Sequence, residues 1–361
     1  MKRITFIAFS LLAGLALLSS CKKDQIPAAP EGAVELDPAG QTPTFYSSAL
    51  TYVITSNCDW SISVDEGSDL TVDPLEGVAG TSNISVILPD NTTNDVLKSS
   101  FTVVFRNSAD VVCNYVIDIE QPRPSVEIGG MSYPVARLAD GKWWMTENLR
   151  YCPAGKTVSK DLSDIANGVW YPTTTDGTTM SFDESATGVV EKGYLYTPEV
   201  AFGTAVTADN YDKLAKVQGI CPEGWHIPDF DDWFALVGHC SNSKEIPDDT
   251  AAPYYDEALK GFGSIAKAAA DGMPFPITGY VNVANASSAT GILVGHIGTA
   301  GARTMNLGYV LSSSSYKLTP NTDGSVKNIQ LYSLMTNANS RTLNLAYLNY
   351  RSGVSVRCVK D

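Results

Sequence analysis

The sequence predicts a mainly β chain in two parts, an antiparallel β-sandwich followed by a loop-rich α+β domain. The chain has 361 residues, a length typical of about two domains. Short apolar segments alternate with a period of two up to residue 121, as half-buried strands do. Beyond residue 128 the sequence is rich in Gly, Thr and Tyr and carries few helix signals. Each part is long enough to have a core of its own.

The first 20 residues have the pattern of a secretory signal. Lys2 and Arg3 precede a short apolar run at residues 4–18, and small residues follow. The run is shorter than the roughly 20 apolar residues that a spanning helix needs. Its end, LSSC at 18–21, resembles the bacterial lipobox, in which the cysteine is acylated and becomes the first residue. We therefore expect a signal peptide at 1–20, lipidation of Cys21 and attachment to the outer membrane, on its surface or periplasmic face. An ordinary signal peptide that ends near a cysteine is the alternative.

An acidic composition limits what the exported part can bind. The formal net charge is −14 at pH 7. Such a surface repels nucleic acid and anionic headgroups, so no nucleic-acid partner is expected. No second long apolar stretch follows the signal. Membrane attachment is therefore expected through lipid on Cys21 alone.

Residues 34–121 have the pattern of an immunoglobulin-like sandwich. Roughly seven short antiparallel strands are expected there, separated by Gly, Pro, Asp and Asn turn signals. The clearest predicted strands lie at 52–55, 60–64, 84–88, 101–105 and 111–119. Residues 21–33 are polar and rich in Pro and Ala and predict a flexible tether, and residues 122–127 predict a Pro-containing linker.

The cysteines of this segment suggest a bridge between sheets. The chain has seven cysteines, and lipid on Cys21 leaves an even number for disulfides in an exported protein. Strand parity places Cys58 on the face of Trp60, and it places Cys113 on the apolar face of its own strand. An inter-sheet disulfide between Cys58 and Cys113 is predicted, with two buried free thiols as the alternative.

Three short motifs give this segment a resemblance to a known family. They are SNCDWSI at 56–62, LTVDP at 70–74 and IDIEQ at 117–121. In order and spacing they resemble the BACON domain of secreted Bacteroidetes proteins. The resemblance implies carbohydrate binding, and a spacer role is the alternative. Trp60 alternates with Ile62 and Val64, so it is expected in the core rather than on a sugar-binding surface.

The second domain is predicted at residues 128–361. Its clearest helix follows Pro228, where Asp229 can cap the helix and Asp232 stands three residues on, close to a capping box. Gly238 is expected to end it. A second helix is expected from about 255 to 270, and late strands at 309–312, 329–336, 344–347 and 354–359.

Five motifs in this domain resemble the Fibrobacter succinogenes major paralogous domain. They are MTENL at 145–149, GYLY at 193–196, GICPEGWHIP at 219–228, DW at 232–233 and SVRCVKD at 355–361. The family resembles, more distantly, the C-type-lectin-like fold of formylglycine-generating enzymes. The resemblance implies that Cys221 pairs with Cys358. Cys152 and Cys240 then remain, and whether they pair by elimination is left open by the sequence. The family's Trp-Ser-Ser-Thr strand is VLSSSS at 310–315 here, which puts a groove lined by that tryptophan in doubt.

No residue set in the sequence identifies a reaction. There is no Gly-x-Ser-x-Gly elbow, HExxH or P-loop. The cluster of Asp229, Asp231 and Asp232 is explained by a helix start, with a carboxylate pair as the alternative. His226 is interpreted as a structural corner rather than an acid-base group. We expect no metal site, no cofactor and no enzymatic activity.

Aromatic side chains near loops are the remaining route to binding, because their faces stack on sugar rings and anchor protein contacts. The candidates for ligand binding are Trp143, Trp170, Tyr171, Tyr194 and Tyr196. Adjacent Trp143 and Trp144 must point to opposite faces of a strand, so at least one belongs to the core. The expected function is a non-catalytic adhesin or glycan-binding module with a glycan or surface protein as ligand. A tip component of a surface or fimbrial assembly is the alternative, and a polysaccharide-active enzyme is the least favoured.

Overall fold

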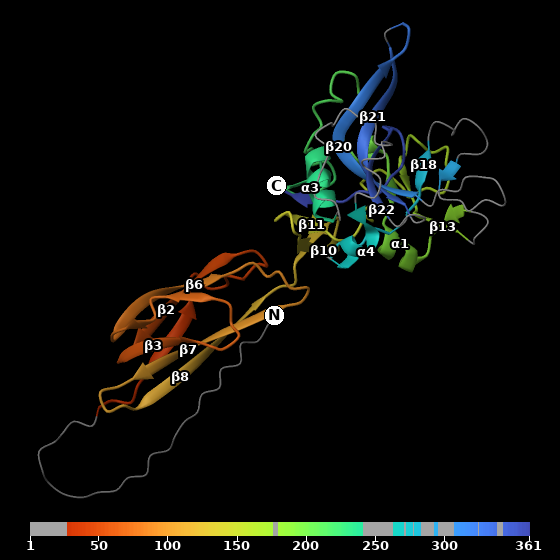
Figure 1. Ribbon diagram of the computed structural model, residues 1–361. Helices are drawn as coiled ribbons and strands as arrows, with labels where there is room; N and C mark the ends of the chain where they lie inside the picture. Colours follow the sequence, from red (N-terminus) through yellow and green to blue (C-terminus); the bar gives the residue numbers. More distant parts are fainter. Residues whose placement is uncertain are drawn as a thin grey trace, which may run out of the picture. The chain divides into compact units, whose positions relative to one another are not determined.

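The computed structural model is mainly β and divides into two compact units. It describes residues 27–175, 180–240, 263–270, 272–276, 278–282, 292–294, 307–323, 325–337 and 342–361 (Figure 1). Within these ranges, no helix is long and apolar enough to span a membrane.

The first unit has two four-stranded sheets. One has the order β1-β2-β6-β4, with β1 at Gly32–Leu36, β2 at Ser48–Ser56, β6 at Gly80–Leu88 and β4 at Thr71–Asp73. The other has the order β5-β3-β7-β8, with β5 at Glu76–Gly77, β3 at Asp59–Val64, β7 at Leu97–Arg106 and β8 at Val112–Gln121. All five predicted strands are present in these sheets. Strands β2 and β7 are longer than predicted at both ends, β3 and β6 begin earlier, and β8 begins one residue later and ends two residues later.

Period-two alternation builds the core of this unit. Burial alternates along β2, β6 and β7, so one face of each strand packs inward. The buried residues are Leu50, Tyr52, Ile54, Ile84, Val86, Leu88, Phe101, Val103 and Phe105. Trp60 is also buried, as its alternation predicts. Its indole lies so close to Gly77 that a Cβ there would be 2.3 Å from the ring, which explains the glycine.

The predicted Cys58–Cys113 disulfide is wrong, because both thiols are free. Both pack against the core, as parity predicts. However, Cys58 directly precedes β3 and Cys113 lies on β8, and these strands flank β7 in one sheet. Neighbouring strands are about 4.8 Å apart, so strands on either side of a third are about 10 Å apart. A disulfide needs Cα atoms within about 7 Å.

The boundaries of the units differ from the predicted ones. Two segments inside the predicted sandwich, Pro43–Ser47 and Asp90–Leu97, belong to the second unit. The described end of the predicted tether is held in place: Asn57 Nδ2 donates to the carbonyl of Ala29 at 2.9 Å, and Asn107 Nδ2 donates to that of Ala28 at 2.8 Å. The predicted linker at 122–127 runs into a strand, β9, at Ser125–Ile128.

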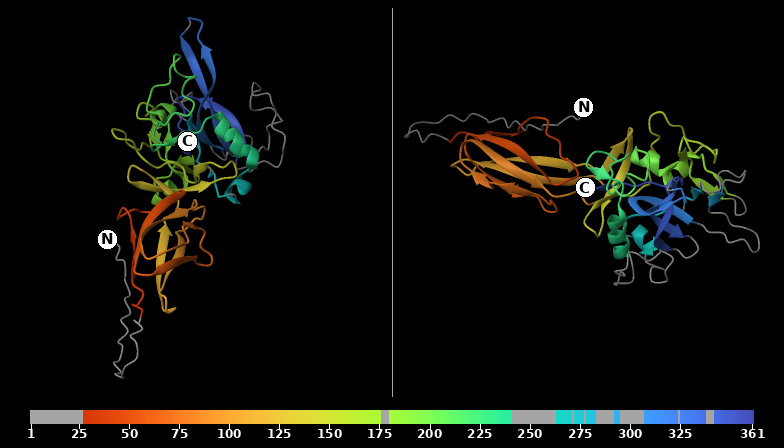
Figure 2. Two further views of the ribbon diagram at one scale, coloured as in Figure 1. Left: turned by 90° about the vertical axis from the view of Figure 1, so that its left-hand side faces the viewer. Right: turned by 90° about the horizontal axis from the view of Figure 1, so that it is seen from above.

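The second unit contains two larger sheets. The five-stranded sheet has the order β16-β23-β11-β10-β9, with β16 at Trp225–His226, β23 at Val359–Lys360, β11 at Trp143–Met145 and β10 at Met131–Arg137. The four-stranded sheet has the order β17-β22-β21-β20, with β17 at Gly263–Ser264, β22 at Thr342–Asn349, β21 at Val326–Asn337 and β20 at Leu307–Pro320. Figure 2 shows the β20–β21 hairpin, in blue, extending beyond the rest of this unit.

Short ladders and helices complete the unit. The two-stranded ladders pair β12 at Val169–Trp170 with β15 at Leu195–Tyr196, β13 at Thr173–Thr175 with β14 at Met180–Phe182, and β18 at Tyr280–Asn282 with β19 at Ile292–Val294. The helices are α1 at Ala186–Lys192, α2 at Pro198–Phe202, α3 at Phe230–Cys240 and α4 at Ile265–Ala270. The predicted helix at 255–270 is present in its described part as α4, preceded by β17; residues 255–262 lie outside the described residues. Of the predicted late strands, the first three lie within β20, β21 and β22. In the predicted strand at 354–359, Val354 and Ser355 form isolated bridges and Val359 begins β23.

Adjacent tryptophans divide the core of this unit, as strand parity predicts. Trp143 joins one buried cluster, where its ring lies 5.2 Å from that of Phe45. Trp144 joins another, where its ring lies 5.0 Å from that of Trp233 on α3. Strand β11 therefore has a core on each face, and Phe45, from the first part of the sequence, completes one of them.

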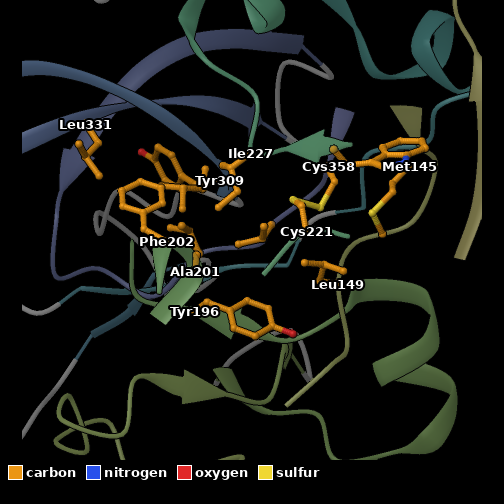
Figure 3. Close-up of a cluster of buried hydrophobic side chains, with 14 of the residues drawn as sticks. Met145, Leu149, Tyr196, Ala201, Phe202, Cys221, Ile227, Tyr309, Leu331 and Cys358 are labelled. Carbon is orange, nitrogen blue, oxygen red and sulfur yellow. A yellow bond between two sulfur atoms is a disulfide. The ribbon is translucent and has the colours of Figure 1, made fainter. Parts of the chain in front are cut away.

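A disulfide fixes the last strand. Of the predicted pairs, the structure forms Cys221–Cys358, across a sequence separation of 137 residues. Figure 3 shows the bonded sulfur atoms inside the buried cluster that includes Met145 and Leu149. Cys152 has a free thiol, so the predicted pair with Cys240 is not formed; the side chain of Cys240 lies outside the described residues.

Candidate functional site

Three of the five predicted ligand-binding aromatics are buried, which corrects the sequence interpretation. Trp170 and Tyr196 are fully buried, and Trp143 is 6% exposed. Trp170 sits on β12 with its Nε1 donating to the carbonyl of Asp161 at 2.8 Å. The Tyr196 hydroxyl donates to the carbonyl of Tyr151 at 2.7 Å. The polar tips of Trp170 and Tyr196 thus have partners inside the protein. All three rings are core groups, although their positions near loops suggested exposure.

The other two, Tyr171 and Tyr194, are half-buried and pack against each other. Their ring centroids are 5.7 Å apart, edge to face. Burial raises the pKa of Tyr194, and the neighbouring Tyr171 and Cys152 add to the effect. The two rings are perpendicular, so they do not form a single flat platform on which a sugar ring could stack.

A cluster of charged groups lies where the last strand meets α3. We call it the His226 cluster; its members are Lys142, His226, Asp229, Asp232 and Asp361. The two ring nitrogens of His226 lie 2.9 Å from Asp232 Oδ2 and 2.5 Å from Asp361 Oδ1. Lys142 Nζ pairs with Asp232 Oδ1. Asp229 and Asp232 each accept a hydrogen bond from the other's main-chain nitrogen at 2.9 Å, which is the reciprocal pattern of a capping box.

The electrostatics of this cluster favour fixed charges. Burial alone would lower the pKa of His226, but hydrogen bonds and attraction from Asp232 and Asp361 outweigh it and raise the pKa. Burial would likewise raise the pKa of Asp232, but His226 and Lys142 hold it well below its usual range. Both imidazole nitrogens are occupied by carboxylates, so the ring has no free position for proton transfer to a substrate. His226 therefore connects β16 to the first turn of α3 and to Asp361.

A second buried basic residue, Arg357, lies in the core of the same unit. Arg357 is fully buried; its Nε donates to Asn148 Oδ1 at 2.6 Å, and Nη2 donates to the carbonyl of Pro274. The guanidinium carbon lies 4.4 Å from the centre of the Phe275 ring. Burial lowers the pKa of Arg357 to about 9, and the charge of Glu147 partly opposes this. These contacts hold the terminal strand to the segment that contains the MTENL motif.

A polar hollow beside α2 is the candidate site. We call it the α2 hollow; it has a volume of about 390 Å³ and is lined by Lys156, Ile165, Ala166, Thr197, Glu199, Val200 and Arg351. That volume falls at the small end of the range for ligand sites. Three chain segments that are far apart in the sequence meet here, namely the loop before β12, helix α2 and the turn after β22.

Local hydrogen bonds hold the walls of the α2 hollow. Asn167 accepts from the main-chain nitrogen of Thr157 at 3.0 Å and donates back to the Thr157 carbonyl at 2.5 Å, which closes the loop that carries Lys156. Thr197 caps α2, with its hydroxyl accepting from Val200 N at 3.4 Å. The main-chain nitrogen of Thr197 also donates to the Gly168 carbonyl at 2.9 Å. The wall is therefore formed before any ligand arrives.

The three charges that line the α2 hollow form no ion pair with any residue that the structure describes. Lys156 Nζ donates to the carbonyl of Ala166 at 2.9 Å, and Glu199 accepts from Val206 N at 3.4 Å. Arg351 Nε donates to the Tyr350 hydroxyl at 2.8 Å. Sequence reasoning missed this site because no local motif links residues 156, 199 and 351; only the fold brings them together.

A second hollow lies in the first unit. It has a volume of about 640 Å³, and Cys58, Trp60, Arg106 and Asn107 are among its lining residues. Trp60 contributes little of its surface there, because it is 3% exposed. Across both units, the described His, Cys, Asp and Glu residues include no group of three placed to hold a metal ion.

Comparison with known families decides the affiliation of the second unit. A model of the Fibrobacter succinogenes major domain matches residues 139–360. The chain belongs to this family. The match covers β11, the His226 cluster apart from Asp361, both bonded cysteines and the α2 hollow, so the candidate site lies inside the family domain. No curated protein matches the chain.

Solved structures give distant similarities. A Bacteroides ovatus GH5 xyloglucanase in complex with a XXXG heptasaccharide is 18% identical, with 37% of this chain and 25% of that chain covered and a TM-score of 0.21. A C. elegans MSP family member, WR4, is 13% identical over 24% of this chain and 96% of its own, with a TM-score of 0.19. The PapD-like domain 7 of human CEP192 is 11% identical, with 32% of this chain and 99% of that chain covered and a TM-score of 0.21. The chain thus spans about a quarter of the length of the xyloglucanase.

Proposed function

We propose that this chain is a lipid-anchored binding protein of the cell envelope, a non-catalytic adhesin or glycan-binding module. The observation that carries the proposal is the α2 hollow, where Lys156, Glu199 and Arg351 converge without ion-pair partners among the described residues. Charged groups that face a small preformed hollow are available to a ligand. A glycan fits because hydroxyl groups both donate to carboxylates and accept from cations.

The contrast with the His226 cluster supports a non-catalytic role. Catalysis needs a titratable group that can reach a substrate and exchange a proton with it. His226 and Asp232 are buried, and their polar atoms are occupied by each other, by Lys142 and by Asp361. This cluster serves to hold the terminal strand against α3.

The cell-envelope location rests on the sequence. The signal-like residues 1–20 and the lipobox-like LSSC predict acylation of Cys21. Metabolic labelling with a radioactive fatty acid tests this directly. The wild-type chain should incorporate the label and fractionate with the outer membrane, whereas Cys21→Ser should remain unlabelled.

Two finer affiliations belong to the same proposal. The first unit is BACON-like, a proposal supported by its three sequence motifs and its two four-stranded sheets. The second unit is C-type-lectin-like with α+β character. This is supported by β23, which lies between β11 and β16 and so ties the end of the domain to its beginning.

A component of a surface or fimbrial assembly is the second candidate function. Strand β8 is the last in its sheet order, and the described residues add no further strand beside it. Val112 and Val116 on this strand are 46% and 59% exposed. Unprotected edge strands accept a strand from another chain. A polysaccharide-active enzyme is the least favoured function.

One screen separates these functions. The chain from residue 22 onward is applied to a glycan array and to insoluble polysaccharides, and the supernatants are tested for released reducing sugar. Glycan binding without sugar release supports the proposal. Binding to no sugar, combined with self-association that Val116→Lys abolishes, favours assembly. Release of sugar shows an enzyme and contradicts the proposal.

A further inference from the structure

We infer that the α2 hollow recognises a sugar that carries a single carboxylate, such as a hexuronic acid residue or another acidic sugar at a chain end. This inference rests on the proposed glycan-binding function and names the ligand class of the same site. Its basis is the charge of the hollow, with two cations and one carboxylate, and the position of its apolar wall.

Arg351 is the group suited to the carboxylate. A guanidinium binds a carboxylate through two parallel hydrogen bonds when its outer nitrogens are available. The Nε of Arg351 is used by the Tyr350 hydroxyl, and the guanidinium carbon lies 5.1 Å from the centre of the Tyr350 ring. This contact orients the side chain, while Nη1 and Nη2 have no hydrogen-bond partner among the described residues.

Lys156 and Glu199 are suited to the rest of the ligand. Lys156 Nζ spends one hydrogen bond on the Ala166 carbonyl, and an ammonium group has three to give. Glu199 receives one weak hydrogen bond at one oxygen, so the carboxylate has capacity left for sugar hydroxyls. A ligand with both an acid and hydroxyl groups satisfies both residues.

The size and the lining of the α2 hollow favour one sugar ring. Its volume is about 390 Å³, and Ile165, Ala166 and Val200 give it an apolar side. A pyranose ring has C–H groups on its faces and polar groups around its edge, which matches an apolar wall flanked by charges. A long apolar ligand would find too little apolar surface here.

The charge of the whole chain argues for one carboxylate rather than many. The hollow has a local excess of one positive charge, whereas the chain has a net charge of −14. A polyanion such as a sulfated polysaccharide would be repelled by the surrounding surface. A single acidic ring can enter the hollow without bringing further negative charges close to that surface.

Titration calorimetry and ligand-observed NMR test the inference. The chain from residue 22 onward is titrated with glucuronic, galacturonic and N-acetylneuraminic acids, with glucose and galactose, and with acetate. We expect at least one acidic sugar to bind at least tenfold more tightly than its neutral counterpart and than acetate. Arg351→Gln and Lys156→Gln should each weaken that binding at least tenfold. Lys213→Gln, which changes the same charge at an exposed lysine outside the hollow, should leave it unchanged.

The remaining outcomes contradict either the preference for acidic sugars or the proposed glycan-binding function. Equal binding of acidic and neutral sugars shows a glycan site without the proposed carboxylate preference. Equal binding of acetate shows a carboxylate site without sugar recognition. Binding that is unchanged in Arg351→Gln places the site elsewhere in the chain. Each of these results leaves glycan binding on the parent array unaffected, whereas an array without any bound glycan removes the proposed function itself.

Discussion

Nε2 of His226 lies 2.9 Å from Oδ2 of Asp232, a contact that joins strand β16 to the first turn of α3. The other ring nitrogen meets Asp361, the final residue of the sequence. This histidine thus connects the helix start, the strand β16 on which it lies and the end of the chain. The positive charge of His226 is therefore expected to stabilise the second unit.

Stability should fall as pH rises through the pKa of His226. The folded-state pKa is raised above its ordinary value of 6.5, so the stabilisation is fully present below about pH 6.5 and is lost as pH rises through the folded pKa. Asp232, with its pKa lowered from 3.8, contributes above that pH and loses its contribution only in stronger acid. We expect the melting temperature to decline as pH rises above about 6.5, by about 2–4 °C for each kcal/mol lost. His226→Gln should remove most of this decline, and an unchanged pH profile in that variant would contradict the assignment.

The disulfide should contribute strongly to the second unit. The disulfide joins residues that are 137 apart in the sequence. In the chain-entropy model, restricting the unfolded chain in this way stabilises the folded state by about 5 kcal/mol. Cys221→Ser combined with Cys358→Ser should therefore lower the free energy of unfolding by about that amount in urea titrations. Cys152→Ser changes a free thiol and serves as the control, with little expected change. Equal stability of the double variant and the wild type would refute this role.

The first unit should contain two reactive thiols after unfolding and no bridge. Cys58 and Cys113 are both free and half-buried. Unfolding in denaturant with an alkylating reagent and no reductant should label both, and peptide mapping should find Cys221 and Cys358 unlabelled. A linked peptide that contains Cys58 and Cys113 would restore the sequence-based prediction.

Asn148 should contribute strongly to the stability of the second unit. It is 1% exposed, accepts from Arg357 Nε and donates to the Lys192 carbonyl at 2.8 Å. Asn148→Ala leaves a buried guanidinium and a buried carbonyl with one partner fewer, at a cost of about 2–5 kcal/mol. Asn210→Ala, which removes two exposed hydrogen bonds, should cost less than about 1 kcal/mol in the same urea titration. If Asn148→Ala lowered the free energy of unfolding as little as Asn210→Ala does, the hydrogen bond from Arg357 to Asn148 would not be needed for stability.

Phe45 should stabilise the second unit although it lies within the predicted sandwich sequence. It is 8% exposed and packs edge to face on Trp143. Phe45→Ala should cost about 3 kcal/mol or more. Calorimetry with and without reductant identifies the transition of the disulfide-bearing unit, and that transition should be the one lowered. Leu75→Ala, at a 52% exposed position, is the control. A shift confined to the reductant-insensitive transition would place Phe45 in the first unit.

The parts of the fold that were predictable from sequence depend on local patterns. Strands β2, β3, β6, β7 and β8 follow from period-two alternation, and the start of α3 follows from the spacing of Asp229 and Asp232. Parity also places Trp143 and Trp144 in separate clusters. Strand order was not predictable in this way. Parity put Cys58 and Cys113 on inward faces, but which sheet each strand joins depends on long-range pairing.

The candidate site was harder to predict for the same reason. Residue type suggested that aromatics near loops would be exposed, yet Trp170 and Tyr196 are anchored in the core by hydrogen bonds to main-chain carbonyls. The charges of the α2 hollow come from three separate segments, and each of them alone reads as an ordinary surface residue. Their convergence depends on the packing of α2 against the loop before β12 and the turn after β22.

The most direct test of the proposed function compares three proteins on one glycan array: the chain from residue 22 onward, its Arg351→Gln variant and its Lys213→Gln variant. If the α2 hollow is a glycan site, the first and third proteins bind the same set of glycans, enriched in acidic sugars, and Arg351→Gln loses them at unchanged melting temperature. Absence of binding by the unmodified chain, or equal binding by Arg351→Gln, would contradict the assignment of function to this hollow.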